Sequence, residues 1–327
     1  MDIISSFSAK GILNTLLLAP VALYRIWKFL KDHRITAVNF HYPSLSALSV
    51  AVLKRLGAFQ GKLVLSFHGT DVRTPARGVE ARAWSFLLET SDAITACSNS
   101  LARQVGDIYG IDTGRVTVIY NGVDTNVFCP ALAATKPTTA AVSATKPYIV
   151  SIGSYIERKG HRFLIEAFCA IKDRYPSIGL IIVGGYGAEL VATQVHVDSV
   201  GLVNRVTLLV DQTPADVARV VAGAAMCVQP SLAEPFGLAV IEAGACNVPV
   251  IATAVGGHVE LIEHSVNGLL VPSADSAAIT QAIDYLLTNQ NETKVLAKNF
   301  RTTILKKFSW EKCAVQYLTV VNDVTRC

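Results

Sequence analysis

The sequence predicts an α/β protein that contains two doubly wound parallel sheets. Its 327 residues exceed what one hydrophobic core usually covers, so two domains are expected. Hydrophobic residues make up 51% of the chain and charged residues 17%, which is typical of a globular protein and excludes a disordered one. Short, almost continuously apolar runs alternate with helical patterns, as they do in parallel sheets covered on both faces.

Nine apolar runs predict strands. In the first part of the chain they are 37–40, 62–67, 93–96 and 116–119. In the second part they are 148–152, 179–183, 206–209, 226–229 and 248–252, and one more strand fits before Pro272. Helical patterns lie between the strands, for example at 163–173 and 215–222, so each set predicts βαβ units.

A segment of small and polar residues separates the two sets of strands. Residues 131–147 read ALAATKPTTAAVSATKP, which predicts a linker. We therefore predict a first Rossmann-like domain over 1–130, a second over 148–308, and a C-terminal helix over 309–327 that packs back on the first domain. The first domain is expected to be incomplete, because no opening strand and no Gly-rich turn precede residue 37.

Composition excludes several function classes. The net charge of +4 is too weak to predict a nucleic-acid partner, which requires a concentrated basic patch. The seven cysteines form no C-x-x-C pair, which indicates free thiols in a reducing compartment. No histidine cluster has metal-ligand spacing. No D-x-D pair is present to hold Mg²⁺ or Mn²⁺ on a diphosphate, so no metal is expected.

The apolar stretch 11–24 is shorter than the ~20 residues that cross a bilayer. A signal peptide would require a small-residue cleavage site, which does not follow. Two interpretations stay open. The segment is an ordinary amphipathic helix, or 11–34 lies on a membrane surface through its basic residues Arg25, Lys28, Lys31 and Arg34.

The most informative stretch is 229–260, QPSLAEPFGLAVIEAGACNVPVIATAVGGHVE. A strand ends at Gln229, a short loop carries Glu234, and a helix begins near Phe236 and Gly237. A helix N-terminus presents unpaired N–H groups that suit a phosphate. Asn247 is expected to end the helix, because Asn tolerates the left-handed conformation after a helix.

Glu242 follows Glu234 by eight residues and falls within the apolar helix stretch 238–245. A carboxylate in such a place needs a partner, and paired ribose hydroxyls would serve because a carboxylate only accepts hydrogen bonds. The alternative is that both glutamates are solvated near helix termini.

Three other strand ends carry candidate residues. Gly153 begins a tight turn that leads to Arg158 and Lys159, which suit phosphate oxygens, although an isolated Arg-Lys pair can equally be a solvated surface. His68 follows a strand in SFHGTDV, where a lone histidine is more often structural. Asn121 begins an Asn-Gly turn in VIYNGVD. The GGYG turn at 184–187 does not complete a dinucleotide fingerprint, so no dehydrogenase follows from it.

Together these residues resemble the retaining glycosyltransferases of family 4, which have the GT-B fold of two Rossmann-like domains facing across a cleft. The resemblance covers about residue 60 to the C-terminus. Its most specific part is the E-x7-E motif from Glu234 to Glu242, set in EPFGLAVIEA. The ordered companions are HGTD, SNS, YNGVD, GSYIERKG, VGGYG, VPVIAT and NGLLVP.

The resemblance implies a role for each matching residue. Arg158 and Lys159 would clamp the donor diphosphate and stabilise it as it leaves. Glu242 would bind the nucleotide ribose, and Glu234 would hold hydroxyls of the donor sugar. The backbone N–H groups around Phe236, Gly237 and Leu238 would bind sugar and phosphate, His68 would lie near the transferred sugar, and Gly153 and Asn121 would line the cleft.

The resemblance also implies the reaction. A sugar would move from a nucleotide-diphosphate donor, expected to be a UDP-sugar, to a glycan or a lipid-linked acceptor. The anomeric configuration would be retained by front-face attack, without metal or other cofactor. Stabilisation of the departing diphosphate and closure of the two domains would carry the catalysis. We expect a cytoplasmic enzyme, and peripheral contact with the inner face of the membrane through 11–34 stays open as one of the two interpretations of that segment.

The sequence departs from the family at three places. Asn247 replaces a usual Gly, Tyr120 replaces a common Pro, and the family's first strand and Gly-rich loop, which line the acceptor side, have no counterpart. The last departure favours one alternative, a non-catalytic or truncated nucleotide-sugar-binding protein or subunit. A GT-B phosphorylase or epimerase would share the same motifs.

Overall fold

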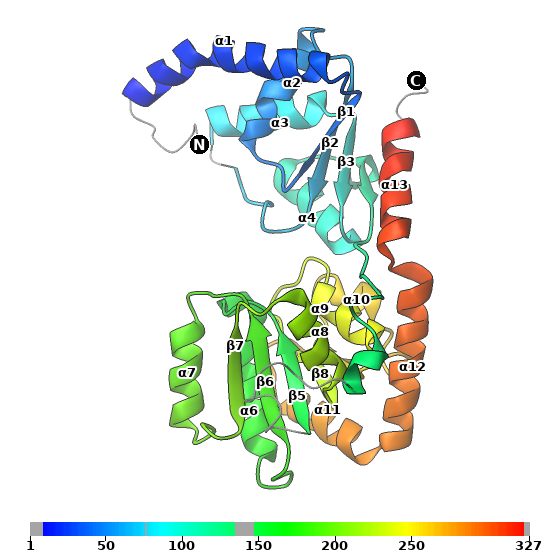
Figure 1. Ribbon diagram of the computed structural model, residues 1–327. Helices are drawn as coiled ribbons and strands as arrows, with labels where there is room; N and C mark the ends of the chain where they lie inside the picture. Colours follow the sequence, from blue (N-terminus) through cyan, green and yellow to red (C-terminus); the bar gives the residue numbers. More distant parts are fainter. Residues whose placement is uncertain (1–8, 76, 135–146, 324–327) are drawn as a thin grey trace. The chain divides into compact units, whose positions relative to one another are not determined.

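The computed structural model describes residues 9–75, 77–134 and 147–323 of the chain (Figure 1). Its contacts divide the chain into two compact units. The first contains the chain up to Cys97, Leu101–Ile119 and the residues from Tyr317 onward. The second contains Ser98–Ser100 and Tyr120–Gln316. The domain boundaries drawn from the sequence stay a prediction, and most of the predicted linker 131–147 lies outside the described residues.

The first unit contains a four-stranded parallel sheet in the order β1-β2-β3-β4. The strands are β1 (Ala37–His41), β2 (Lys62–Phe67), β3 (Ala93–Ala96) and β4 (Val116–Val118). Each predicted strand is present, with ends that differ by at most one residue. The buried run from Leu63 to Phe67 in β2 explains why this strand reads as continuously apolar.

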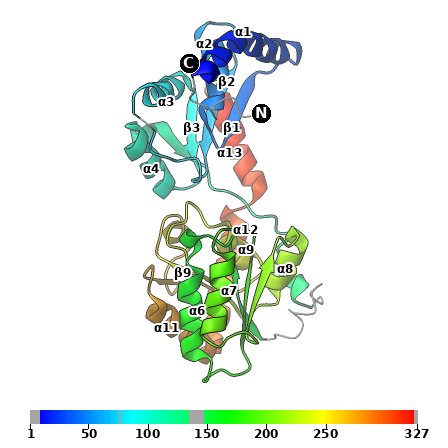
Figure 2. The same ribbon diagram turned by 90° about the vertical axis from the view of Figure 1, so that its left-hand side faces the viewer.

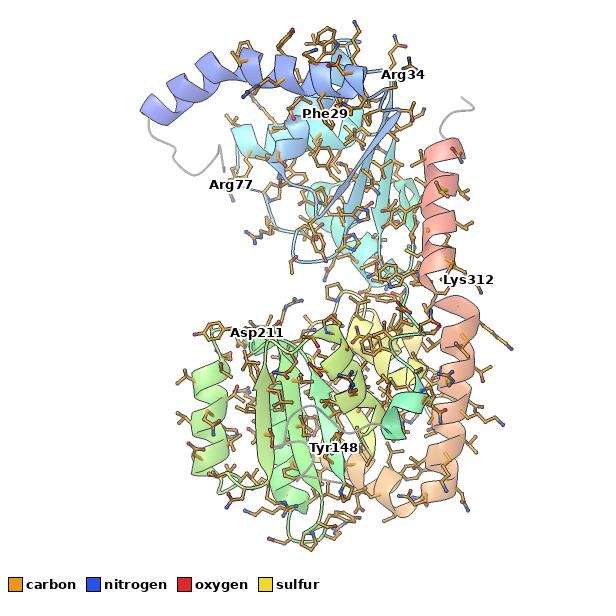
Figure 3. All side chains as sticks on the ribbon, in the orientation of Figure 1. Phe29, Arg34, Arg77, Tyr148, Asp211 and Lys312 are labelled. Carbon is orange, nitrogen blue, oxygen red and sulfur yellow. The ribbon has the colours of Figure 1, made fainter. Side chains whose placement is uncertain are left out.

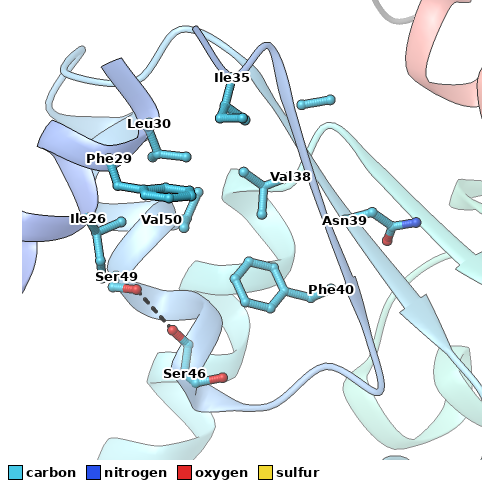
Figure 4. A pocket seen from close by; sticks show the side chains of 11 residues that line it. Ile26, Phe29, Leu30, Ile35, Val38, Asn39, Phe40, Ser46, Ser49 and Val50 are labelled. Carbon is cyan, nitrogen blue, oxygen red and sulfur yellow. Dashed lines mark hydrogen bonds between the residues drawn. The ribbon is translucent and has the colours of Figure 1, made fainter. Parts of the chain in front are cut away.

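Helices pack beside this sheet, with α1 against α2 and α2 against α3. They are α1 (Ala9–Asp32), α2 (Leu48–Arg55), α3 (Val79–Thr90) and α4 (Asn99–Tyr109). An apolar pocket of about 570 Å³ lies between α1, β1 and α2 and is lined by Phe29, Leu30, Val38, Phe40 and Val50 among others (Figure 4). None of the helices in the described ranges combines the length and the hydrophobicity that a bilayer crossing requires.

The second unit contains a six-stranded parallel sheet in the order β10-β9-β8-β5-β6-β7. The strands are β5 (Tyr148–Ile152), β6 (Gly179–Gly184), β7 (Val206–Val210), β8 (Met226–Gln229), β9 (Val250–Thr253) and β10 (Leu269–Val271). β9 begins two residues later than predicted, because Val248 still donates its N–H to Ala243 at the end of the preceding helix. β10 is the additional strand for which the sequence left room.

Helices cover both faces of this sheet, with α6, α7 and α11 on one side and α8, α9 and α12 on the other (Figures 1 and 2). They are α6 (His161–Ile171), α7 (Leu190–Ser199), α8 (Pro214–Ala222), α9 (Leu238–Ala245), α10 (His258–Leu261), α11 (Ser276–Thr288), α12 (Gln290–Lys307) and α13 (Trp310–Asp323). Residues of α13 from Tyr317 onward group with the first unit. This doubly wound arrangement places the strands' carboxyl ends, where such sheets bind ligands, at one edge.

Two buried tyrosines fix the centre of the second unit. Tyr148 lies at the amino end of β5 and donates a hydrogen bond of 2.7 Å to the Val220 carbonyl (Figure 3). Tyr155 donates to the carbonyls of Ile182 and Leu209. Both side chains are fully buried, and their hydroxyls are satisfied, as a closely packed core requires.

Candidate active site

The loop after β5 carries the two candidate cations. Gly153 donates its N–H to the Val183 carbonyl at 2.9 Å, which ties the loop to the end of β6. A single 3₁₀ turn, Glu157–Lys159, then presents Arg158 and Lys159 before α6 begins. The guanidinium of Arg158 has no side-chain partner within the described residues, so its donors are available to a ligand.

Gly160 joins this loop to the loop after β8. It adopts a left-handed conformation with φ of 65°, and a Cβ on it would lie 2.2 Å from the Pro230 carbonyl oxygen. Only glycine allows both this conformation and this close approach. The Arg158 carbonyl also accepts a 2.7 Å hydrogen bond from Leu232 N–H. The two loops that carry the candidate charges are therefore fixed against each other.

Lys159 and Glu234 form a close ion pair in which Nζ lies 2.6 Å from Oε2. Their side chains are only 15% and 12% exposed. Burial pushes the pKa of Glu234 upward, but the charges of Lys159, His258 and Arg158 outweigh burial and lower it. Glu234 is therefore an ionised carboxylate, and its backbone carbonyl is held by a 2.8 Å hydrogen bond from Gly257 N–H.

The N-terminus of α9 follows directly. Gly237 precedes the helix with φ of 116°, and a Cβ on it would lie 2.9 Å from Cδ2 of His258. The side chain of Phe236 is buried in an aromatic cluster with Tyr120 and Phe308, so only its backbone can serve a ligand. Leu238 is 43% exposed at the first turn, where N–H groups have no intrahelical acceptor.

Glu242 lies on the same helix among the buried residues Val240, Ile241 and Ala243. Its carboxylate has no hydrogen-bond partner within the described residues. Burial raises the pKa of Glu242 to about 7, and the positive charge of Lys159 only partly opposes this. The carboxyl groups of Glu234, just before α9, and Glu242, on α9, thus differ in protonation. Glu234 is paired and charged, whereas Glu242 is unpaired and costly to ionise. Beyond Glu242, Asn247 ends the helix with φ of 60°, as predicted.

Two histidines that sequence reasoning missed support this site. His258 is buried and hydrogen-bonded through Nδ1 to the Thr253 carbonyl at 3.0 Å. His161 is buried at the start of α6, and its Nε2 donates to the carbonyls of Gly153 and Ser154. Burial lowers the pKa of His161 to about 4, so its ring is neutral. Each histidine follows its strand by several residues and bonds back to a carbonyl at the start of its own strand-to-helix connection.

Glu260 is a third residue that the sequence did not single out. Its carboxylate accepts hydrogen bonds from the backbone N–H groups of Asn99 and Ser100 and from the Tyr120 hydroxyl. Tyr120, which departs from the family's usual Pro, therefore has a polar partner as well as its aromatic packing. The neighbouring Asn121 is almost fully buried in the Asn-Gly turn.

His68 belongs to the first unit, at the carboxyl end of β2. Its backbone N–H donates to the Asp71 carboxylate at 3.0 Å, and its Nε2 lies 2.8 Å from Nδ1 of His41. Burial, together with the neighbouring His41, lowers the pKa of His68 to about 4. Of the predicted site residues, Arg158, Lys159, Glu234, Gly153, Gly237 and Glu242 all lie around the strand ends of the second unit, and Asn121 belongs to that unit too. In the ranges that the structure describes, no three His, Cys, Asp or Glu side chains are grouped to hold a metal ion.

Two parallel-sheet α/β units, with charged and glycine-rich loops at the strand ends of the second, are the arrangement of the GT-B fold class. Comparison with protein families agrees. Residues 136–303 match the family described as Glycosyl transferases group 1, and residues 8–127 match Glycosyltransferase Family 4. The chain belongs to the group 1 glycosyltransferases, which confirms the resemblance seen in the sequence.

Curated relatives and solved structures are glycosyltransferases or share their fold. The chain is 27% identical over 293 residues to N-acetyl-alpha-D-glucosaminyl L-malate synthase of Bacillus anthracis, covering 88% of this chain and 75% of the relative. It is 28% identical to D-inositol 3-phosphate glycosyltransferase of Mycobacterium marinum, over 73% of this chain but only 52% of that protein. Anabaena HepE, crystallised with UDP and glucose, aligns over 97% of this chain and 83% of its own with a TM-score of 0.77 and 22% identity.

Proposed function

We propose that this glycosyltransferase binds a nucleotide-diphosphate sugar at the strand ends of its second unit. The observation that carries the proposal is Glu242, an unpaired and largely buried carboxylate on α9 whose pKa is raised to about 7. An unpaired carboxylate in such a place is unfavourable unless a ligand supplies donors. The two hydroxyls of a ribose are donors of that kind, and an ionised carboxylate can accept a hydrogen bond from each of them at the same time.

The diphosphate would lie between Arg158, Lys159 and the N-terminus of α9. Arg158 is free of side-chain partners within the described residues, and the backbone N–H groups around Phe236, Gly237 and Leu238 add the positive end of the helix dipole. Lys159 has three donors and uses one on Glu234, which leaves others for phosphate. These groups would stabilise the negative charge of the departing diphosphate without a metal ion.

The donor sugar would contact Glu234, Gly153, Asn121 and His68. Glu234 is ionised and held at its backbone, so it can accept hydrogen bonds from sugar hydroxyls. Its pairing with Lys159 makes it a poor nucleophile, which supports front-face transfer with retention of the anomeric configuration. We propose a UDP-sugar as donor, in line with the UDP and glucose bound to HepE, and a glycan or a lipid-linked acceptor.

A basic and apolar helix supports membrane proximity. On α1, Val21, Tyr24 and Phe29 are each more than half exposed, beside Arg25 and Lys31. Figure 3 shows Phe29 on this helix and Arg34 just after its end. Such a face suits an anionic bilayer surface, so we propose that residues 11–34 hold a cytoplasmic enzyme at the inner membrane face. Co-sedimentation with anionic vesicles, lost on Arg25→Glu, is the expected result, whereas equal sedimentation of the variant contradicts it.

A thermal-shift screen tests the donor proposal. The purified chain is heated with UDP, GDP or ADP and their sugar conjugates, with and without Mg²⁺. A ligand that binds the folded state raises the unfolding temperature. We expect one nucleotide to raise it without metal, and Glu242→Ala to remove the rise, while the exposed Glu311→Ala control retains it. A well-folded sample that responds to no nucleotide contradicts the proposal.

Hydrolysis and transfer assays then separate the proposed enzyme from its alternative, a nucleotide-sugar-binding protein without catalysis. The paired Lys159 and Glu234 favour the enzyme. Sugar release that depends on Arg158 is expected. Tight donor binding without any release, with acceptors of both the glycan and the lipid-linked kind, would favour the alternative.

A further inference from the structure

A row of polar side chains crosses the carboxyl end of the sheet in the first unit. Thr95 Oγ1 donates to Ser66 Oγ at 2.9 Å, and Ser66 Oγ donates to Asn39 Oδ1 at 2.8 Å. Asn39 Nδ2 lies 3.2 Å from His41 Nε2, and His41 Nδ1 lies 2.8 Å from His68 Nε2. The row therefore runs from the buried residues Thr95 and Ser66 to His68.

Strand register brings these groups together. His41 in β1 is opposite Ser66 in β2, and Ser66 is opposite Thr95 in β3. Because side chains alternate along a strand, Asn39 and His41 share one face of β1, and Val38 and Phe40 share the other. Figure 4 shows Asn39 leaving the strand on the side away from Val38 and Phe40, which line the apolar pocket.

The hydrogen bonds have one consistent direction. Since Asn39 Oδ1 accepts from Ser66, its amide presents an N–H to His41, so His41 Nε2 must accept. A neutral imidazole carries one proton, which then lies on His41 Nδ1 and is donated to His68 Nε2. His68 Nε2 accepts in turn, so the proton of His68 lies on Nδ1. Burial lowers the pKa of both histidines, in keeping with two neutral rings.

We propose that Asn39 and His41 are positioning residues that fix His68 as its Nδ1–H tautomer, which makes this N–H the hydrogen-bond donor that His68 offers to an oxygen of the donor sugar. In the part of the chain that the structure describes, Nδ1 of His68 has no protein acceptor. This inference rests on the proposed function for its ligand, but the tautomer itself is a property of the free protein.

The contacts that orient the rings of His41 and His68 differ from the contact that decides which ring nitrogen carries the proton. Tyr42 packs on His68 with ring centroids 4.6 Å apart, and Tyr317 packs on His41 at 5.3 Å. The Asp71 carboxylate accepts from the backbone N–H groups of His68 and Gly69 and holds the loop. These contacts orient the rings in either tautomer. Only the amide of Asn39 selects which nitrogen carries the proton.

The test is NMR of the full chain with ¹⁵N-labelled histidine, without ligand, at about pH 8, where neutral histidine dominates. The His68 signals are assigned by their loss in His68→Gln. We expect a protonated Nδ1 and an unprotonated Nε2. In Asn39→Asp the carboxylate can only accept, so His41 Nε2 takes its proton and the His68 tautomer inverts. In the uncharged Asn39→Leu, both tautomers are expected.

The NMR result tests the row of hydrogen bonds, and the kinetic result tests the positioning role of Asn39 and His41. A wild-type His68 protonated on Nε2 overturns the relay, even where the variants do not fold. Kinetics then test the role of the tautomer: Asn39→Asp should raise the donor KM about tenfold, the loss of one hydrogen bond to the ligand. An inverted tautomer with an unchanged KM overturns the positioning role. The donor site itself is tested separately, by the effect of Glu242 and Arg158 variants on nucleotide binding.

Discussion

Lys159 Nζ lies 2.6 Å from Glu234 Oε2, and the two side chains belong to loops that follow different strands of one sheet. Both side chains are largely buried and have lost most of their hydration. The ion pair is the main interaction that offsets this loss for each of them. The pair joins the cation proposed for the diphosphate to the carboxylate proposed for the sugar. A change at one residue must therefore alter both stability and binding.

Removal of one partner should destabilise the fold more than removal of both. We expect Glu234→Leu to cost about 3 kcal/mol, because it leaves the Lys159 charge buried without a partner. The double variant Lys159→Met, Glu234→Leu should recover more than half of that loss while nucleotide binding stays abolished. Urea unfolding of the two single variants and the double variant measures this, and strictly additive losses would contradict the coupling.

Nucleotide binding should strengthen with rising pH. The pKa of Glu242 is about 7 in the free protein, and ribose hydroxyls favour the ionised form. Affinity should therefore rise as pH increases through 7 and level off above it, by up to about tenfold per pH unit below 7. Titrations from pH 6 to 8.5 measure this. Glu242→Gln should bind weakly with a flat profile, and a sloping profile in that variant would assign the titration to another group.

The same carboxylate should lower stability at high pH. Its folded pKa is raised above the unfolded value of 4.5, so the stability that the protonated form provides is lost as pH rises toward and through 7. Glu242→Gln should therefore stabilise the fold more at pH 8 than at pH 5. Thermal unfolding of both proteins at the two pH values measures the difference, and an equal effect at both would contradict the raised pKa.

Two glycines with similar conformations offer a matched comparison. Gly160 has φ of 65° and Gly201 has φ of 69°, but only Gly160 has a close neighbour, the Pro230 carbonyl 2.2 Å from a built Cβ. Gly201→Ala should cost only backbone strain, about 1 kcal/mol. Gly160→Ala should cost roughly 3 kcal/mol or more and weaken nucleotide binding, because the loops of Lys159 and Glu234 must separate. Similar losses for the two variants would contradict the role of the close approach.

His161 should make the fold sensitive to mild acid. Its folded pKa is about 4 against 6.5 when unfolded, so the unfolded chain binds the proton first. Stability from this group is present above pH 6.5 and is lost as pH falls toward 4, by on the order of 3 kcal/mol. His161→Gln should remove this part of the acid dependence. Urea unfolding at pH 7 and 4.5 checks it, and an unchanged pH dependence would assign the loss elsewhere.

The sequence predicted elements well where the pattern is local. The strand 62–67 reads as continuously apolar because β2 is buried along its whole length, and Asn247 was expected in the left-handed conformation that it adopts. The places of Glu234, Arg158 and Lys159 after strand ends could be predicted from the sequence, and the chemistry assigned to them stays a prediction. The family resemblance then turned separate candidates into one site.

What the sequence could not provide are contacts between distant loops. Neither the pairing of Lys159 with Glu234 nor the His41–His68 contact has a spacing that repeats or a local propensity. Glu260 reads as an ordinary surface glutamate, although four donors converge on its carboxylate. Such partners are brought together by the order of the strands in each sheet, which the sequence does not specify directly.

The most direct test of the donor site is isothermal titration of the full chain with the nucleotide selected by the thermal screen. We compare the parent protein with Arg158→Ala and Glu242→Ala, and use Arg162→Ala on the neighbouring helix as the control. We expect each of the two site variants to raise Kd at least about tenfold, or 1.4 kcal/mol, while the control binds like the parent. Two site variants that bind as tightly as the parent would contradict the central claim.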